Sequence, residues 1–169
     1  EIKRFNEYID FKTLEKWFYE LLHEYAKWAS WELKWHEKRN ISIKNIEFPF
    51  EYRPGQNTLV KGVYQTILRK KRLYIEAPTG VGKTISTIFP AVKAMGEELS
   101  EKLFYLTAKT ITRTVAQDAF NILSDNGVHL KYVTITAKEK ICILDKPTCN
   151  PGSCPRALGH FDRVNDAVF

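Results

Sequence analysis

The sequence predicts an α/β fold, in which a parallel sheet is covered by helices. Two observations support this fold class. After residue 72, short apolar or alternating runs that are typical of strands take turns with helical patterns, so that three strand–helix units follow one another. A glycine-rich turn also joins the first of these strands directly to its helix. Successive strand–helix units form parallel sheets with right-handed crossovers, and we expect a long helix before this sheet and a cysteine-rich segment after it.

The first expected element is a helix from about Phe11 to Lys38, with Asp10 as its N-cap. Apolar residues recur at helical spacing over some seven turns, and four of them are tryptophans: Trp17, Trp28, Trp31 and Trp35. Stacking on nucleic-acid bases is one interpretation of this stripe. The favoured interpretation is a packing face whose partner lies outside this chain or on the surface of the following domain.

A connector from Ile41 to Pro49 is expected to become extended, because Pro49 disfavours helical angles at the residue before it. Pro54 and Gly55 then open a second helix, whose apolar residues lie on one face. The basic run 69–72 at its end is interpreted as solvated, since cations are favourable at a helix C-terminus.

Three strands are predicted after this helix, at Leu73–Ala77, Leu103–Thr107 and Leu130–Thr136. Between the first two, a helix is predicted from Lys83 to about Met95. Gly96 is expected to stop that helix, and Pro90 to kink it or end it early.

The helix between the second and third strands is predicted from Ile111 to about Ser124, closed near Gly127.

The charge is compatible with a polyanion-binding protein, and the sequence contains no candidate membrane span. The 169 residues have a net charge of +6, and residues 51–169 hold the whole surplus, with 17 basic and 11 acidic side chains. Excess positive charge attracts nucleic acid, although a solvated surface explains it equally well. No stretch approaches the roughly 20 apolar residues of a membrane helix, and no signal peptide is evident. We therefore expect a cytoplasmic protein, and the start at Glu1 suggests a piece of a longer one.

The glycine-rich turn has the form of a phosphate-binding loop, and it consists of Ala77, Pro78, Thr79, Gly80, Val81, Gly82, Lys83 and Thr84. Glycines let the backbone curl around a phosphate, and the N–H groups at a helix N-terminus face the anion. Lys83 is expected to reach the β- and γ-phosphates, and the Thr84 hydroxyl to bind Mg²⁺. The common pattern opens with Gly, so that Ala77 is a departure from it. A chance glycine-rich turn is the alternative.

Two further groups of residues are candidates for binding a nucleotide or a nucleic acid. Before the second helix, the Gln56 amide carries both a donor and an acceptor, which matches adenine, and Tyr52 or Arg53 can stack on the base. Alternatively, Gln56 is an ordinary first-turn residue.

At the end of the second strand, the hydroxyls and ammonium of Thr107, Lys109 and Thr110 suit a nucleic-acid backbone, or the threonines merely cap the helix.

The cysteines Cys142, Cys149 and Cys154 lie among prolines and glycines in the last part of the chain. In a cytoplasmic protein such a cluster favours a metal over disulfides. An iron–sulfur cubane needs four thiolates, so its fourth ligand would lie beyond Phe169. A zinc site can instead use His160, and three unligated thiols are the remaining alternative.

These residues together resemble a known family, the DinG/XPD-type iron–sulfur DNA helicases of superfamily 2. The resemblance covers about residues 48–169 and is carried by four segments: Phe48–Gln56, Glu76–Thr84, Phe104–Thr110 and Lys138–Cys142. It implies a helical linker at 1–47, the first part of a RecA-like motor domain at 48–137, and the start of an iron–sulfur insert at 138–169.

The same resemblance implies ATP-driven movement on single-stranded DNA, in DNA repair or replication, with ATP, Mg²⁺ and a [4Fe–4S] cluster as cofactors. Its partners would be single-stranded DNA and the rest of the helicase polypeptide, including a possible nuclease-like domain. Gln56 would read adenine, and Lys83 and Thr84 would bind phosphate and Mg²⁺. Residues 107–110 would contact the DNA strand. The three cysteines would be ligands of the iron–sulfur cluster, and because relatives carry a fourth cysteine downstream, the resemblance favours iron over zinc.

No D-E-A-H-type acidic motif and no second motor domain are present in these residues. We therefore expect the chain to bind nucleotide weakly without hydrolysing it. The main alternative function is a non-motor P-loop protein, either a nucleotide switch or a small-molecule kinase with a zinc loop. A DNA-binding module without catalysis fits the charge but leaves Lys83 and Thr84 unexplained.

Overall fold

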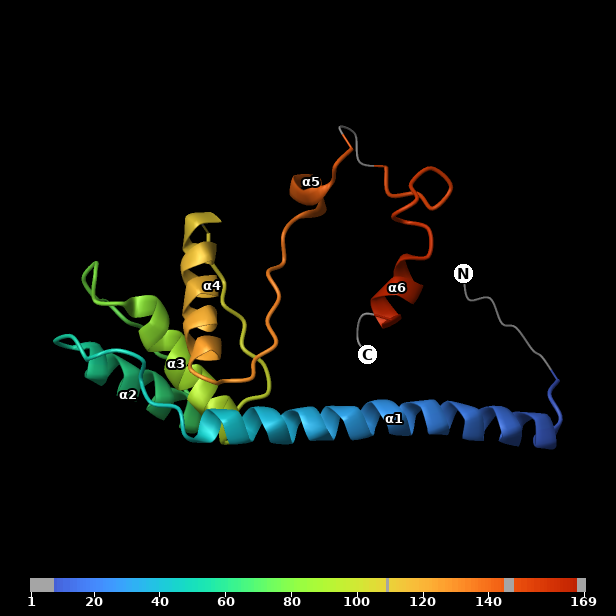
Figure 1. The fold of residues 1–169 in the computed structure, drawn as a ribbon, viewed down its shortest axis with the longest axis horizontal. Coiled ribbons are helices and arrows are strands. Elements are labelled where there is room, and N and C mark those ends of the chain that lie inside the picture. Colours follow the sequence, from blue (N-terminus) through green and yellow to red (C-terminus); the bar gives the residue numbers. More distant parts are fainter. Residues whose placement is uncertain (1–7, 109, 145–147, 167–169) are drawn as a thin grey trace. The chain divides into compact units, whose positions relative to one another are not determined.

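The computed structural model describes residues 8–108, 110–144 and 148–166, without the side chains of 110–112 and 165. Its helices follow in the order α1 (Phe11–Lys44), α2 (Gln56–Leu68), α3 (Lys83–Gly96), α4 (Thr110–Asp125), α5 (Lys138–Ile141) and α6 (His160–Asp166) (Figure 1). The chain divides into two compact units. The central unit comprises residues 31–133, and the second unit comprises 1–30 together with 134–169.

The predicted parallel sheet is wrong: no strand occurs among the residues that the structure describes. The three predicted strand segments belong to no helix, and they are not joined in a ladder. Their alternation nevertheless survives. Leu103 and Tyr105 pack against the core, whereas Phe104 and Leu106 are 75% and 88% exposed. A strand pattern fixes which side chains share a face, but pairing depends on segments far away in sequence.

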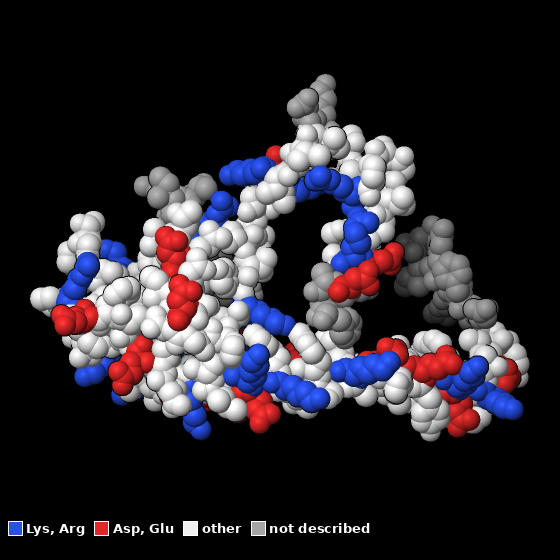
Figure 2. Space-filling model, in the orientation of Figure 1, with Lys and Arg blue, Asp and Glu red and all other residues white. Residues whose placement is uncertain are grey.

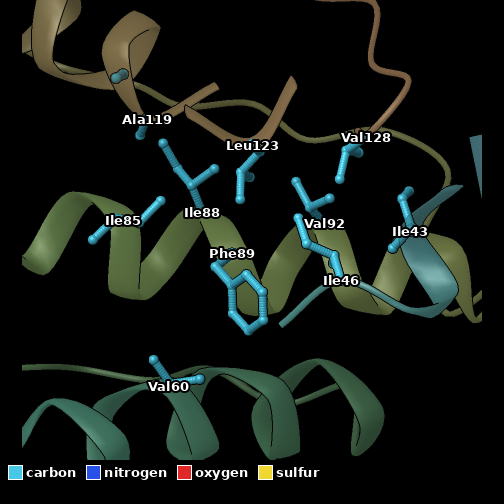
Figure 3. Packing of buried hydrophobic residues seen from close by; sticks show 11 residues of the cluster. Ile43, Ile46, Val60, Ile85, Ile88, Phe89, Val92, Ala119, Leu123 and Val128 are labelled. Carbon is cyan, nitrogen blue, oxygen red and sulfur yellow. The ribbon is translucent and has the colours of Figure 1, made fainter. Parts of the chain in front are cut away.

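Helix–helix packing takes the place of the sheet in the central unit (Figure 3). Helix α3 lies between α2 and α4, and eight of its fourteen residues are buried. Such a helix is apolar on more than one side, which is typical of a central helix. The buried cluster comprises Ile43, Ile46, Val60, Ile85, Ile88, Phe89, Val92, Ala116, Ala119, Leu123 and Val128.

Pro90 lies inside α3 and is fully buried, and α3 continues past it to Gly96. The expected early end of this helix is therefore wrong. The helix ends within one residue of the predicted end, but Gly96 is its last helical residue and the left-handed residue that follows the C-cap is Glu98. Gly96 is needed for a different reason. A Cβ at Gly96 would lie 2.5 Å from Cγ2 of Ile43, so glycine permits the close approach of α1 to the end of α3.

The long first helix was predicted correctly, although it runs six residues beyond Lys38. Its start is capped as expected, because Asp10 Oδ1 accepts a hydrogen bond from the Thr13 backbone N–H at 3.1 Å and Asp10 Oδ2 accepts one from the Thr13 hydroxyl. Its last carbonyl groups are bound by the Lys93 ammonium, at 2.9 Å from the oxygen of Lys44.

Charges of both signs are interspersed along α1 (Figure 2), as the balanced composition of this region requires. Ion pairs at helical spacing join Lys16 to Glu20 and Lys27 to Glu24. The aromatic stripe is only partly packed: Trp17 is 56% exposed, whereas Trp31 and Trp35 receive the Lys131 ammonium at 3.8 and 4.5 Å from their ring centroids. The prediction that this stripe is a packing face therefore applies to its second half.

The second unit is held by local turns in its C-terminal part. The Asn150 carbonyl accepts hydrogen bonds from the backbone N–H groups of Ser153 and Cys154, at 3.0 and 2.9 Å. Arg163 on α6 donates to the carbonyl oxygens of Leu158 and Arg156, at 2.8 and 2.6 Å. No helix in the described ranges is both long enough and apolar enough to cross a membrane.

Candidate nucleotide-binding site

The predicted phosphate loop connects the segment after α2 to the first turn of α3. Gly80 and Gly82 have φ angles of 83° and 78°, in the left-handed region that glycine tolerates best. Gly82 is the residue that precedes α3, so the first N–H groups of α3 follow directly from the loop. The loop is largely exposed. The start of the helix at Lys83 and the positive φ angles of the two glycines agree with the prediction, whereas the strand expected before the loop is absent from the described residues 73–77.

Lys83, the first residue of α3, folds its side chain back over the beginning of the loop. Its ammonium donates to the carbonyl oxygens of Ala77 and Pro78, at 2.9 and 2.8 Å. These contacts hold the positive charge of Lys83 against the first two residues of the loop. An ammonium has three N–H donors, and the carbonyl oxygens of Ala77 and Pro78 accept two of them. A phosphate oxygen can accept the third, or it can replace these carbonyl oxygens.

The end of α3 that borders the loop favours an anion. Neither α2 nor α3 carries an acidic residue in its first turn. The unpaired N–H groups and the dipole of a helix N-terminus attract negative charge. Thr84, the predicted Mg²⁺ ligand, is half-buried in this first turn. Serine at position 86 was not among the predicted residues, yet its backbone N–H and hydroxyl both donate to the Gly82 carbonyl, at 3.1 and 2.8 Å.

Gln56 begins α2 and lies against the loop. Its side chain is 3% exposed, and its Oε1 accepts a hydrogen bond from the Arg53 backbone N–H at 3.0 Å. A Cβ built on Gly82 would lie only 2.7 Å from Gln56 Nε2. The glutamine amide therefore packs directly on the second glycine of the loop.

Arg53 and Tyr52 make protein contacts at this place. The Arg53 guanidinium donates a hydrogen bond from Nη1 to the carbonyl oxygen of Gly80. The Tyr52 ring stacks on Phe48 with centroids 4.5 Å apart and an interplanar angle of 9°, and Phe48 meets Phe89 edge to face. One face of Tyr52 is thus covered by Phe48. The sequence identified the segment but did not reveal that Arg53 contacts the phosphate loop.

The predicted DNA contacts are described only in part. Thr107 is exposed at the end of the second predicted strand segment, and Thr110 is the first residue of α4, although its side chain is outside the described part of the structure. Lys109 lies outside the described residues altogether. Contact of these three residues with a nucleic-acid strand stays a prediction.

The three cysteines have different environments: Cys142 is partly buried, Cys149 is exposed and Cys154 is buried. The side chain of Cys149 accepts a hydrogen bond from Lys138, and this contact is the main cause that raises the pKa of the Lys138 ammonium. Among the residues that the structure describes, no three His, Cys, Asp or Glu side chains gather as metal ligands.

The described thiols thus do not form a ligand set for a [4Fe–4S] cluster, nor do they form one for zinc with His160, whose ring lies beside Phe161. Metal binding stays a prediction from the sequence.

Comparisons with protein-family models, with curated proteins and with solved structures found no match to this chain.

Proposed function

We propose that the loop at 77–84 binds the phosphates of ATP with Mg²⁺, that Arg53 and Gln56 are neighbouring residues of the same nucleotide site, and that the chain is a nucleotide-binding part of an ATP-dependent DNA helicase. One observation carries the nucleotide-binding proposal. The glycine loop, the Lys83 ammonium and the acid-free first turn of α3 converge on one exposed place. Each of these features attracts a polyphosphate through a different group, and together they support a common ligand.

The phosphate chemistry follows from the groups at this place. Backbone N–H groups of the loop and of the first turn of α3 donate to phosphate oxygens, and Lys83 supplies the compensating charge. To do so, its ammonium exchanges the Ala77 and Pro78 carbonyl oxygens for phosphate oxygens. The Thr84 hydroxyl is placed one residue later, where Mg²⁺ between the β- and γ-phosphates would be coordinated.

Base recognition is assigned to Gln56. Its Oε1 already accepts the Arg53 backbone N–H, but an amide oxygen has a second lone pair and the amide nitrogen has two donors. Because Gln56 is 3% exposed, adenine would reach these groups only after the residues that cover the amide move. Hydrolysis is not expected from these residues, because the sequence has no acidic motif that would orient Mg²⁺ and the attacking water.

The helicase part of the proposal is supported by the sequence segments around residues 48–56, 76–84 and 104–110 and by the surplus of positive charge after residue 50. The non-motor alternative, a nucleotide switch or kinase, shares the phosphate loop. Binding of oligo(dT) distinguishes them. A motor is expected to bind it with an affinity that falls steeply with salt and changes with ATP, since the two ligands are then thermodynamically linked.

Calorimetric titration of the chain with Mg·ATP tests the nucleotide site. Lys83→Ala removes the ammonium, and we expect the affinity for ATP to fall about 10- to 100-fold, as for other charge-assisted hydrogen bonds. Lys102→Ala is the matched control, because Lys102 is exposed and follows the opposite end of α3. Equal affinities of wild type and Lys83→Ala would refute the site.

A further inference from the structure

Arg53 is attached to the phosphate loop through both its backbone and its side chain. Its backbone N–H donates to Gln56 Oε1, and the same Gln56 side chain packs on Gly82. Its guanidinium donates to the carbonyl oxygen of Gly80, 27 residues further along the chain. The residues at the N-terminal end of α2 therefore contact both glycines of the loop: Arg53 contacts Gly80, and Gln56 contacts Gly82.

The two glycines are restrained in different ways. A Cβ at Gly82 would collide with Gln56, so packing already limits the backbone there. A Cβ at Gly80 would meet nothing within 4 Å, so packing does not hold that residue. Glycine has the largest backbone freedom of all residues, so that fixing its conformation costs the most entropy. The hydrogen bond from Arg53 is the contact that limits this freedom at Gly80.

Holding the Gly80 carbonyl also fixes the N–H group of the next residue. The carbonyl of Gly80 and the N–H of Val81 belong to one planar trans peptide and point to opposite sides of it. With the oxygen turned toward Arg53, the Val81 N–H is turned away from Arg53. A loop that binds phosphate through its backbone N–H groups binds more tightly when the orientation of these groups is already fixed in the free protein.

We propose that Arg53 is a positioning residue that orients the Gly80–Val81 peptide for phosphate binding, a role that rests on the proposed function of the loop. Arg53 then acts on phosphates through the backbone and does not read the base. Its guanidinium suits this task, because its donors are held in a rigid plane. Lysine at this position would keep one charged donor without the fixed geometry.

The test uses wild type, Arg53→Ala, Arg53→Lys and the control Arg69→Ala, which alters an exposed arginine at the opposite end of α2. Calorimetry with ATP, GTP and inorganic tripolyphosphate measures binding, and thermal unfolding verifies that each variant folds. Arg53→Ala is expected to weaken all three ligands by a similar factor of about 5 to 30, with an unchanged ATP-to-GTP ratio. Arg53→Lys is expected to recover part of the loss.

A second readout monitors the loop without any ligand. The heteronuclear ¹H–¹⁵N NOE of the Gly80 and Val81 amides is expected to fall in ligand-free Arg53→Ala, because their picosecond–nanosecond motion increases. An unchanged NOE, or a loss confined to ATP with an altered ATP-to-GTP ratio, would overturn the positioning role. If wild type binds none of the three ligands, the proposed function fails and this role with it. If wild type binds and Arg53→Ala binds equally well, only the role of Arg53 fails.

Discussion

At the scale of single residues, the phosphate loop depends on two glycines with similar backbone angles and different surroundings. Gly80 and Gly82 both have positive φ angles, but only at Gly82 would an added Cβ meet another side chain. Its neighbour is the buried amide of Gln56, at the distance where a methyl group would collide. The absence of a side chain at Gly82 is therefore required for the approach of α2 to the loop, as well as for the turn itself.

This difference predicts unequal effects of alanine at the two positions. Gly80→Ala introduces backbone strain alone, and we expect the free energy of unfolding to fall by about 1 kcal/mol. Gly82→Ala adds the collision with Gln56, and we expect a loss of about 2–3 kcal/mol. Urea unfolding followed by circular dichroism measures both. Equal losses in the two variants would show that Gln56 does not pack on Gly82.

At the scale of secondary structure elements, each helix of the central unit from α2 to α4 ends in the same way. The residue after the C-cap has a positive φ angle and the next N–H returns to a carbonyl five residues earlier, as between Val128 and Leu123 at 3.1 Å. Glycine has this role only after α4, at Gly127, whereas Lys70 and Glu98 have it after α2 and α3. The sequence could therefore indicate the end of α4 more clearly than the other two.

One hydrogen bond joins the second half of α2 to the end of α3. The Tyr64 hydroxyl donates to the Glu97 carboxylate, and this bond raises the pKa of Tyr64 above its ordinary value of 10.0. Because the pKa is higher in the folded protein than in the unfolded chain, the stabilisation is complete below pH 10 and is lost as the pH rises through the raised pKa.

Tyr64→Phe is therefore expected to lower the free energy of unfolding at pH 8 and to reduce its decrease above pH 10. The free energies of wild type and variant should converge as Tyr64 ionises. Urea unfolding at several pH values between 8 and 11 provides the measurement, and Tyr74→Phe is the control, because Tyr74 is 87% exposed. A constant difference between wild type and Tyr64→Phe across this range would contradict the assignment.

At the scale of the whole molecule, the core of the central unit is built by helices. Leu123 on α4 is fully buried, whereas Leu106 in the second predicted strand segment is 88% exposed. In a parallel sheet covered by helices on both faces, a residue such as Leu106 would be buried as well. The two leucines therefore distinguish the observed helical packing from the sheet that the sequence predicted.

Leu123→Ala is expected to lower the free energy of unfolding by about 2–5 kcal/mol, because it leaves a cavity in the core. Leu106→Ala is expected to change it by less than about 0.5 kcal/mol, as for other exposed positions. Denaturant unfolding of the two variants tests the packing directly. A loss for Leu106→Ala as large as that for Leu123→Ala would place residues 103–107 in a buried sheet.

The sequence predicted local features better than pairing. The existence of α1 to α4 and the Asp10 cap follow from periodicity and from the chemistry of single residues. Strand pairing depends on contacts between segments that are distant in sequence, and no local pattern encodes these contacts. The absence of a ladder among the described residues was therefore not visible in the sequence. At the site, the motif located the loop and Gln56, but the bond from Arg53 to Gly80 depends on how α2 packs and is not visible in the sequence.

The central claim is that the loop before α3 binds polyphosphate through Lys83 and backbone N–H groups. Calorimetric titration of wild type and Lys83→Ala with ATP and with adenosine tests it most directly. We expect wild type to bind ATP far more tightly than adenosine, and Lys83→Ala to lose most of this difference while its affinity for adenosine is unchanged. Equal binding of ATP and adenosine by the wild-type chain would contradict it.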